Sequence, residues 1–318
     1  MDKNIGVSKT PLLFLIFNRP ETTKEVFEVI KNQRPACLFI AADGPRIERE
    51  GEAEKCRITR EVVLRGIDWD CEVKTYFRDS NVGCGRNVSE AITWFFEHVP
   101  EGIILEDDCL PNDSFFSFCA ELLEKYRENN AISAISGNNF QLQQPMGIEN
   151  DYYFSLFPSS WGWATWARSW KDYELYINKW EKLDKKAFLQ YLFEEKEYQL
   201  WWKNQYDYFF KERPIDTWDF QFHFQSMMRR QLAVIPKANL ISNIGHGPDG
   251  THFNNPDSYF ANMPTYELDF PLTHPECIER NYEADVFIQD MLFGRAEVVS
   301  NFKKIKRLIK RLIKYTPQ

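Results

Sequence analysis

GIILEDDCLP, residues 102–111, places three consecutive carboxylates directly behind an apolar run. Such a run is typical of a strand that is buried in a parallel sheet. Glu106, Asp107 and Asp108 cannot all be ionised side by side without a positive partner, because like charges this close raise one another's pKa. The segment therefore predicts a strand whose carboxyl end meets a cation.

On both sides of this segment, apolar runs alternate with amphipathic ones. Strands are expected within 11–20, 36–45, 71–80, 102–108 and 131–139, and helices within 21–33, 48–66, 81–99 and 113–129. This alternation predicts an α/β fold with a mostly parallel central sheet and helices on both faces. Ligands bind at the carboxyl ends of such strands. Asn18, Arg19, Asp43 and the 81–87 loop all fall at those ends, beside the triplet.

The alternation stops after residue 140. Residues 159–180 hold five Trp, 186–212 is a helical region, and 232–245 resembles one strand, followed by a loop rich in Gly, Asn and Pro. We see no internal repeat and no linker long enough to separate independent domains. We therefore interpret 1–140 and 141–297 as two halves of one domain, followed by a helix over 298–318.

Composition limits the class of protein. A chain of 318 residues with 43% hydrophobic residues can form a real core, which excludes wholesale disorder. The 16% aromatic content fits either core packing or stacking against sugar rings. Seven Cys form no CxxC pair, so a zinc ribbon or a disulfide framework is not expected. With no signal-peptide pattern and no run of about 18 apolar residues, we expect a cytosolic protein.

Charge is unevenly distributed along the chain. The net charge is −8, yet the segment NFKKIKRLIKRLIKYTPQ (301–318) contains seven basic residues and no acidic one. Its apolar residues follow helical spacing, with the basic residues on the other face, which is typical of a helix lying on an anionic membrane. Docking on the acidic body and binding RNA are the alternatives. We expect this helix to bind an anionic membrane surface, so that the protein is peripheral to the cytosolic face of the inner membrane. We expect no nucleic-acid partner.

The triplet alone leaves three interpretations open. Carboxylates at a strand end are suited to Mg²⁺ or Mn²⁺, which prefer oxygen ligands and share them with substrate phosphates. They are also suited to an acid/base pair of the kind that glycoside hydrolysis uses. Simple solvated charges are the third possibility.

The segment 102–139 resembles the metal-binding strand and following helix of GT-A fold glycosyltransferases, in particular those related to N-acetylglucosaminyltransferase I. That group has Glu-Asp-Asp as its variant of the DxD motif. FNRPETTKEVFEVI (17–30), AADGP (41–45) and NVGCGRNVSEAITWFF (81–96) resemble the preceding elements of the same fold. SSWGWATWARSW (159–170) is similar to a segment of bacterial glycosyltransferases that assemble cell-surface polysaccharides.

This resemblance implies roles for the residues at the strand ends. Asp108 would hold the metal, while Glu106 and Asp107 would contact ribose or sugar hydroxyls and orient the metal's waters. The remaining residues would contact the nucleotide: Asp43 the base, Asn18 and Arg19 the base and ribose, and Arg86 and Asn87 the ribose or diphosphate. Arg is well suited to phosphate because its guanidinium binds in a bidentate fashion.

The resemblance also implies a base in the later half. Asp219 is the candidate to take the acceptor's proton, with Asp216 as the alternative and helix capping as the competing explanation. His246, or His252, would complete the metal shell. Trp161 and Trp163 would form the wall of an acceptor site, although core packing explains at least one of them.

We therefore expect a Mn²⁺- or Mg²⁺-dependent glycosyltransferase that moves a sugar from a UDP-sugar to a bacterial surface glycan or lipid-linked precursor, with inversion. A sugar nucleotidyltransferase is the enzymatic alternative, although the expected Gly-rich phosphate loop is absent after the first strand. A catalytically inactive carbohydrate-binding protein is the third hypothesis. Such a protein would not need Glu106, Asp107, Asp108 and Asp219 together.

Overall fold

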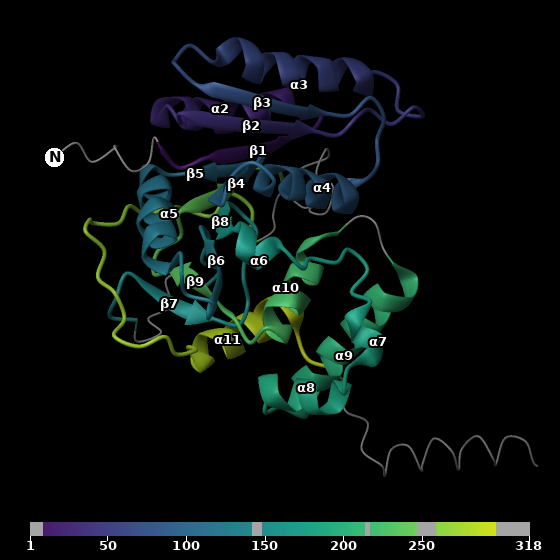
Figure 1. Cartoon of the computed structure of the whole chain (residues 1–318), viewed down its shortest axis with the longest axis vertical. Helices are drawn as coiled ribbons and strands as arrows, with labels where there is room; N and C mark the ends of the chain where they lie inside the picture. Colours follow the sequence, from purple (N-terminus) through teal and green to yellow (C-terminus); the bar gives the residue numbers. More distant parts are fainter. Residues whose placement is uncertain (1–8, 142–147, 214–216, 247–258, 297–318) are drawn as a thin grey trace, which may run out of the picture.

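The computed structural model describes residues 9–141, 148–213, 217–246 and 259–296. One eight-stranded sheet, in the order β3-β2-β1-β4-β8-β6-β9-β7, runs through the molecule (Figure 1). Its strands are β1 Leu12–Ile16, β2 Cys37–Ala42, β3 Glu72–Phe77, β4 Glu101–Glu106, β6 Ile132–Ser136, β7 Tyr152–Ser155, β8 Trp163–Trp166 and β9 Leu232–Pro236. Only β8 and β7 run against the others, so the sheet is mostly parallel, as predicted.

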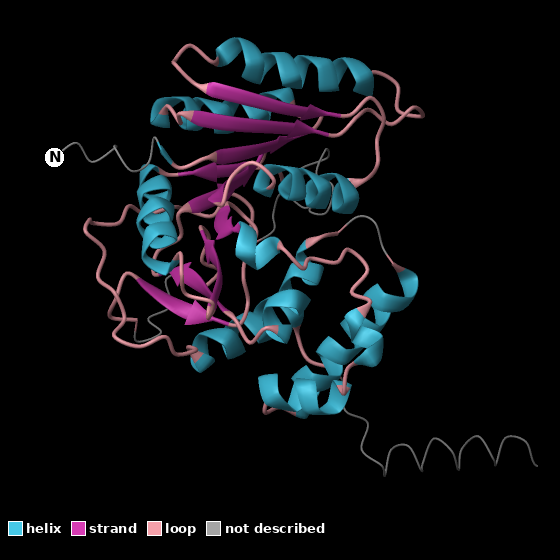
Figure 2. Ribbon diagram, in the orientation of Figure 1, coloured by secondary structure: helices cyan, strands magenta, loops and turns pink. Residues whose placement is uncertain are grey.

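Helices cover both faces of the sheet (Figure 2). The five strands and four helices predicted before residue 140 are all present; the strands are β1, β2, β3, β4 and β6, and the helices are α2 Pro20–Gln33, α3 Glu52–Gly66, α4 Cys84–Phe96 and α5 Asp113–Tyr126. Side chains alternate along β1: Phe14 packs with α2, α3 and α5 on one face, and Leu13 packs with α4 on the other. Because β1 is covered on both sides, its sequence is a continuous apolar run.

The second half of the chain inserts into the same sheet. β8 pairs antiparallel with β4 on one side and with β6 on the other. β9 then pairs parallel with β6. The predicted halves 1–140 and 141–297 therefore contribute strands to a single sheet.

The prediction of one strand over 232–245 is wrong. The segment forms β9, which ends at Pro236, and a separate strand, β10 Ile241–Asn243. β10 leaves the main sheet and pairs antiparallel with β5 Cys109–Pro111, directly after the acidic triplet. The segment that follows β10 therefore lies beside the acidic triplet.

The remaining helices lie beside the sheet, and most of them share a separate aromatic cluster. They are α6 Ala167–Trp170, α7 Lys179–Lys182, α8 Lys185–Leu192, α9 Lys196–Glu212, α10 Asp219–Met228 and α11 Tyr282–Ile288, followed by the π-helical turn η1 Gln289–Phe293. The predicted helical region 186–212 is thus two helices. Trp180, Trp202 and Tyr206 are fully buried between these helices. Much of the aromatic content therefore serves core packing.

Two further predictions concern the whole chain. All seven cysteines are free thiols, as expected. Across the described ranges, we find no helix long and apolar enough to cross a membrane. The predicted basic helix over 298–318 lies outside the described residues.

Candidate functional site

Arg19 is the positive partner of the acidic triplet. It follows β1, and its guanidinium contacts two of the carboxylates at the end of the neighbouring β4: Nη1 lies 2.9 Å from Oδ2 of Asp108, and Nη2 pairs with Oδ1 of Asp107. Burial alone would lower the pKa of Arg19, but the two carboxylates outweigh it and raise that pKa. The predicted convergence of these strand ends is therefore confirmed, with an ion pair that the sequence did not reveal.

The three carboxylates have unequal surroundings. Asp107 is buried and accepts hydrogen bonds from the backbone N–H of Phe17 at 3.0 Å and the hydroxyl of Thr23 at 3.4 Å. Burial raises the pKa of Asp107, and Arg19 opposes this shift. Burial, reinforced by Asp108 and Asp107, raises the pKa of Glu106 to about 8. One arginine and a raised pKa of Glu106 thus relieve the repulsion among three adjacent carboxylates.

The segment after β10 packs tightly against Asp108. The backbone N–H of Ile244 donates to the Asp108 carbonyl at 2.9 Å. At Gly245, an added Cβ would lie 2.3 Å from Oδ2 of Asp108, so only glycine fits there. The next residue is His246, which is buried and stands edge-on to Trp161, with ring centroids 5.9 Å apart. The structure thus brings the segment carrying His246 to Asp108, while a role for His246 as a metal ligand stays a prediction.

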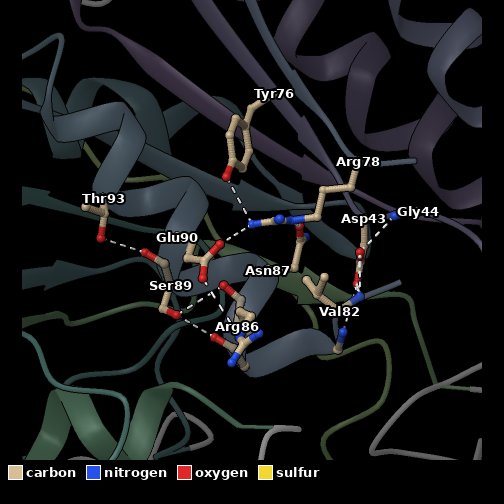
Figure 3. A network of polar contacts seen from close by, with 12 residues as sticks. Asp43, Gly44, Tyr76, Arg78, Val82, Arg86, Asn87, Ser89, Glu90 and Thr93 are labelled. Atoms are coloured by element: carbon tan, nitrogen blue, oxygen red, sulfur yellow. Dashed lines mark hydrogen bonds and ion pairs between the residues drawn. The ribbon is translucent and has the colours of Figure 1, made fainter. Parts of the chain in front are cut away.

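Asp43 organises the loop in front of α4 (Figure 3). Its carboxylate accepts from the backbone N–H groups of Gly44 at 2.8 Å, Val82 at 3.1 Å and Gly83 at 3.2 Å, and from the Asn81 amide at 2.9 Å. These donors occupy most of the positions at which a carboxylate accepts hydrogen bonds. The contacts favour a structural role, and recognition of a base by Asp43 stays a prediction.

Other predicted nucleotide contacts lie on the same edge of the sheet. Arg86 is half-exposed on α4 and lies 3.9 Å from Glu90. Asn87 is buried one residue later, and its Oδ1 accepts from Arg78 at 3.1 Å (Figure 3). Asn18 donates to Glu52 at 2.9 Å. Of these side chains, Arg86 is the most exposed and the best placed to meet an anionic ligand.

Asp219 opens helix α10 and borders a cavity of about 360 Å³. The hydroxyl of Thr217 and the N–H of Phe220 both donate to its Oδ1, at 2.6 and 2.9 Å, and Oδ2 has no hydrogen-bond partner among the described residues. The N-cap residue is Trp218, so Asp219 is not the capping residue. Trp161, which lines the same cavity, stands edge-on to His246, so the cavity adjoins the segment that packs against Asp108. Asp216 lies outside the described residues.

The two tryptophans of the 161–163 segment have different environments. Gly162 between them has φ +60°, in the left-handed region, and an added Cβ would lie 2.5 Å from Ile241. Trp161 lines the cavity. Trp163 is only 1% exposed and stacks on Trp218 in the core, with ring centroids 5.5 Å apart. The structure therefore gives Trp161 a place at the cavity and makes Trp163 mainly a core residue.

Sequence reasoning missed two polar residues of this cavity. Asn138 follows β6, and His223 lies one helical turn after Asp219 on α10. Both are buried and both line the cavity with Asp219. The spacing of Asp219 and His223, four residues apart on a helix, was the available signal. Nothing in the sequence marked Asn138.

The residues around Asp108 could hold a divalent cation only if a bound substrate also coordinates that cation. No group of three His, Cys, Asp or Glu side chains suited to a metal occurs within the ranges that the structure covers. Oδ2 of Asp108 pairs with Arg19, but Oδ1 accepts only the weak Cys109 thiol contact at 3.5 Å. Mg²⁺-type ions often bind through one or two carboxylates plus substrate phosphates and water. Asp108 fits that kind of site, rather than a cage built by protein alone.

No protein-family model and no curated protein sequence matches the chain. Among solved structures, HddC from Yersinia pseudotuberculosis is similar at 8% identity and a TM-score of 0.32, over 52% of this chain and 80% of that one. Two UDP-glucose pyrophosphorylase structures, one ligand-free and one complexed with UDP-glucose, are similar over 71% of this chain and 90% of theirs. Their identities are 8% and 10%, and their TM-scores are 0.34 and 0.32. Similarity this low supports no conclusion about function, which must be argued from the chain's own residues.

Proposed function

We propose that the chain is a glycosyltransferase that moves a sugar from a UDP-sugar to a hydroxyl group of an acceptor. The observation that carries this proposal is that Trp161 connects the aromatic cavity with the triplet: Trp161 lines the cavity and stands edge-on to His246, whose neighbour Gly245 packs against the Asp108 carboxylate. Asp219 also borders the aromatic cavity. A donor bound at the triplet and an acceptor bound in the cavity would therefore meet at this carboxylate.

The donor site would consist of the residues at the strand ends. Asp108 would hold Mn²⁺ or Mg²⁺, with His246 as the second protein ligand. When bound, that ion neutralises charge on the departing diphosphate. Arg86, half-exposed at the start of α4, would bind phosphate oxygens. Arg19 would keep Asp107 and Asp108 in place through its ion pairs.

Transfer would proceed as a single displacement. The acceptor's hydroxyl oxygen attacks the anomeric carbon, and the bond from that carbon to the diphosphate oxygen breaks, with the electron pair leaving on UDP. Oδ2 of Asp219, which has no hydrogen-bond partner among the described residues, takes the hydroxyl proton. Attack from the side opposite the leaving group inverts the anomeric carbon.

Calorimetric titration with nucleoside diphosphates, with and without Mn²⁺, tests the donor site. We expect Mn²⁺ to strengthen UDP binding, Asp108→Ala to remove that gain, and Asp219→Asn to keep it while abolishing transfer. Absence of metal-enhanced binding for every nucleoside diphosphate would refute the proposal. Equal loss of binding in both variants would refute the separate roles of Asp108 and Asp219.

The link between β1 and α2 argues against a sugar nucleotidyltransferase. It consists of Phe17, Asn18 and Arg19, without glycine, and Pro20 begins the helix. Such a link offers few backbone N–H groups to a triphosphate. Release of pyrophosphate from UTP and a sugar phosphate would favour the nucleotidyltransferase instead. Binding of sugars with no turnover of any nucleotide would favour an inactive carbohydrate-binding protein.

We further propose that the acceptor is a bacterial surface glycan or its lipid-linked precursor, reached at the cytosolic face of the inner membrane. The support is the basic, amphipathic sequence of 301–318, which contains seven Lys and Arg and no acidic residue. Deleting 301–318 should reduce binding to vesicles of anionic phospholipid. Unchanged vesicle binding would remove the membrane from the proposal.

A further inference from the structure

The walls of the cavity beside Asp219 are mostly apolar. One group of wall residues has ring centroids 5.2 to 6.5 Å apart and comprises Trp201, Phe220 and Phe293. In a second group, Phe140 stands edge-on to Trp161 and Phe260, with centroids 5.0 and 5.4 Å away. All six side chains are only partly buried, so they present apolar surface that a ligand can cover.

The polar residues of the cavity offer little to a sugar ring placed inside it. The hydroxyl of Ser155 donates to Asp285 at 2.5 Å, and the hydroxyl of Ser159 donates to Asn138. Nδ2 of Asn138 and Nδ1 of His223 are inaccessible from the cavity. A sugar ring between these walls would lose hydrogen bonds to water, and each unpaired hydroxyl would cost free energy. The interior of the cavity therefore favours an apolar group.

The size of the cavity and the position of Asp219 define the shape of such a ligand. The cavity volume of about 360 Å³ is more than twice that of a cavity of about 150 Å³ that holds benzene. Asp219 borders the cavity, and its Oδ2 has no hydrogen-bond partner among the described residues. One molecule can therefore place an alkyl chain in the cavity and a hydroxyl group at Asp219.

The cavity also lies close, along the chain, to the basic amphipathic segment 301–318. Leu292 and Phe293 line the cavity, and the segment begins eight residues after Phe293. Eight residues span at most about 29 Å. A segment bound to an anionic membrane would therefore keep the cavity near the lipid surface, where alkyl chains are available.

We propose that the acceptor is an amphipathic glycoside whose alkyl chain occupies this cavity while its reacting hydroxyl meets Asp219. This inference rests on the proposed glycosyltransferase function, and it selects the lipid-linked precursor as the acceptor class. The aromatic rings hold the alkyl chain by removing its surface from water. The sugar ring lies outside the apolar walls, where its hydroxyls keep polar partners.

Calorimetric titration with alkyl β-D-glucopyranosides, from methyl to heptyl, tests this assignment at concentrations below micelle formation. We expect one site per chain and an affinity that rises about fourfold for each methylene that enters the cavity. Analogues with a hydroxyl at the far end of the alkyl chain should bind more weakly than alkyl glucosides of equal length. Affinity that does not depend on chain length would overturn the proposal.

Leu292→Asn places an amide at the cavity wall. It should weaken binding of the heptyl glucoside about tenfold, because the amide is left without a partner beside the alkyl chain. Binding of the methyl glucoside should not change. Leu64→Asn is the matched control, because Leu64 is 41% exposed on α3 and does not line the cavity, and it should bind both glucosides as the wild type does.

Two outcomes decide between this cavity and a site elsewhere on the protein. If Leu292→Asn bound the heptyl glucoside as tightly as Leu64→Asn does, the alkyl chain would bind elsewhere and the proposal would be wrong. If Leu292→Asn does not fold, the wild-type series still decides, because equal affinity for the methyl and heptyl glucosides overturns the proposal. These titrations contain no nucleotide, so their failure is distinguishable from failure of the UDP titration that tests the proposed function.

Discussion

Arg19 is expected to stabilise the fold by neutralising the buried Asp107. In Arg19→Met, an apolar side chain of similar length replaces the guanidinium, while the Asp107 side chain remains 3% exposed. Removing one partner of a buried pair costs about 3–5 kcal/mol. We expect about 3 kcal/mol, the lower end of that range, because Phe17 and Thr23 still donate hydrogen bonds to Asp107.

Urea denaturation at pH 7 measures this cost. Arg57→Met is the matched control: its guanidinium also pairs with two carboxylates, but it is 53% exposed on α3, so its loss should destabilise the fold far less than Arg19→Met does. Adding Asp107→Asn to Arg19→Met should recover part of the lost stability, because no unpaired charge then remains buried. If Arg19→Met were no more destabilising than Arg57→Met, or if the double variant recovered nothing, the account of the triplet's charge would be wrong.

Two further predictions concern packing and pH. Gly245→Ala should cost about 2 kcal/mol by overpacking and should also weaken UDP binding, because its Cβ would displace the carboxylate of Asp108. Gly51 is the control position, because an added Cβ there meets open space although φ is +77°. Gly51→Ala should cost about 1 kcal/mol and leave UDP binding intact. Equal UDP binding by Gly245→Ala and Gly51→Ala would contradict this reasoning. Burial would raise the pKa of Asp207, but hydrogen bonds from Lys203 and others outweigh it and lower the pKa to about 2. Asp207→Asn should therefore cost about 2 kcal/mol at pH 7, and the difference should close as the pH falls from about 4 to about 2; a constant difference across that range would count against it.

The first half of the chain, 1–140, could be predicted from sequence because each of its signals is local. Apolar runs of four to six residues mark β1, β2 and β4, and helical periodicity marks the segments between them. In a parallel sheet the carboxyl ends share one edge, so Arg19 and Asp108 could be placed together although 89 residues separate them. Their ion pair could not be predicted, because the orientation of a long side chain depends on packing.

The second half of the chain, 141–297, depends on contacts that have no local signal. The break after Pro236 was missed because 232–245 is apolar enough for one strand, while the pairing of β10 with β5 is a tertiary choice. The cavity combines Asn138, Trp161 and His223 from three distant segments. Trp161 and Trp163 look equivalent in sequence, but the left-handed turn at Gly162 separates them into cavity and core.

The central claim is that Asp108 and a nucleoside diphosphate share a divalent cation at the end of β4. A crystal soaked with UDP and Mn²⁺ tests it directly, through the anomalous scattering of manganese. We predict one strong anomalous peak that lies within direct coordination distance of an Asp108 carboxylate oxygen and of an oxygen from each UDP phosphate. Crystals of Asp108→Ala should show no peak at this position. UDP bound without manganese beside Asp108, or manganese bound elsewhere, would contradict the account.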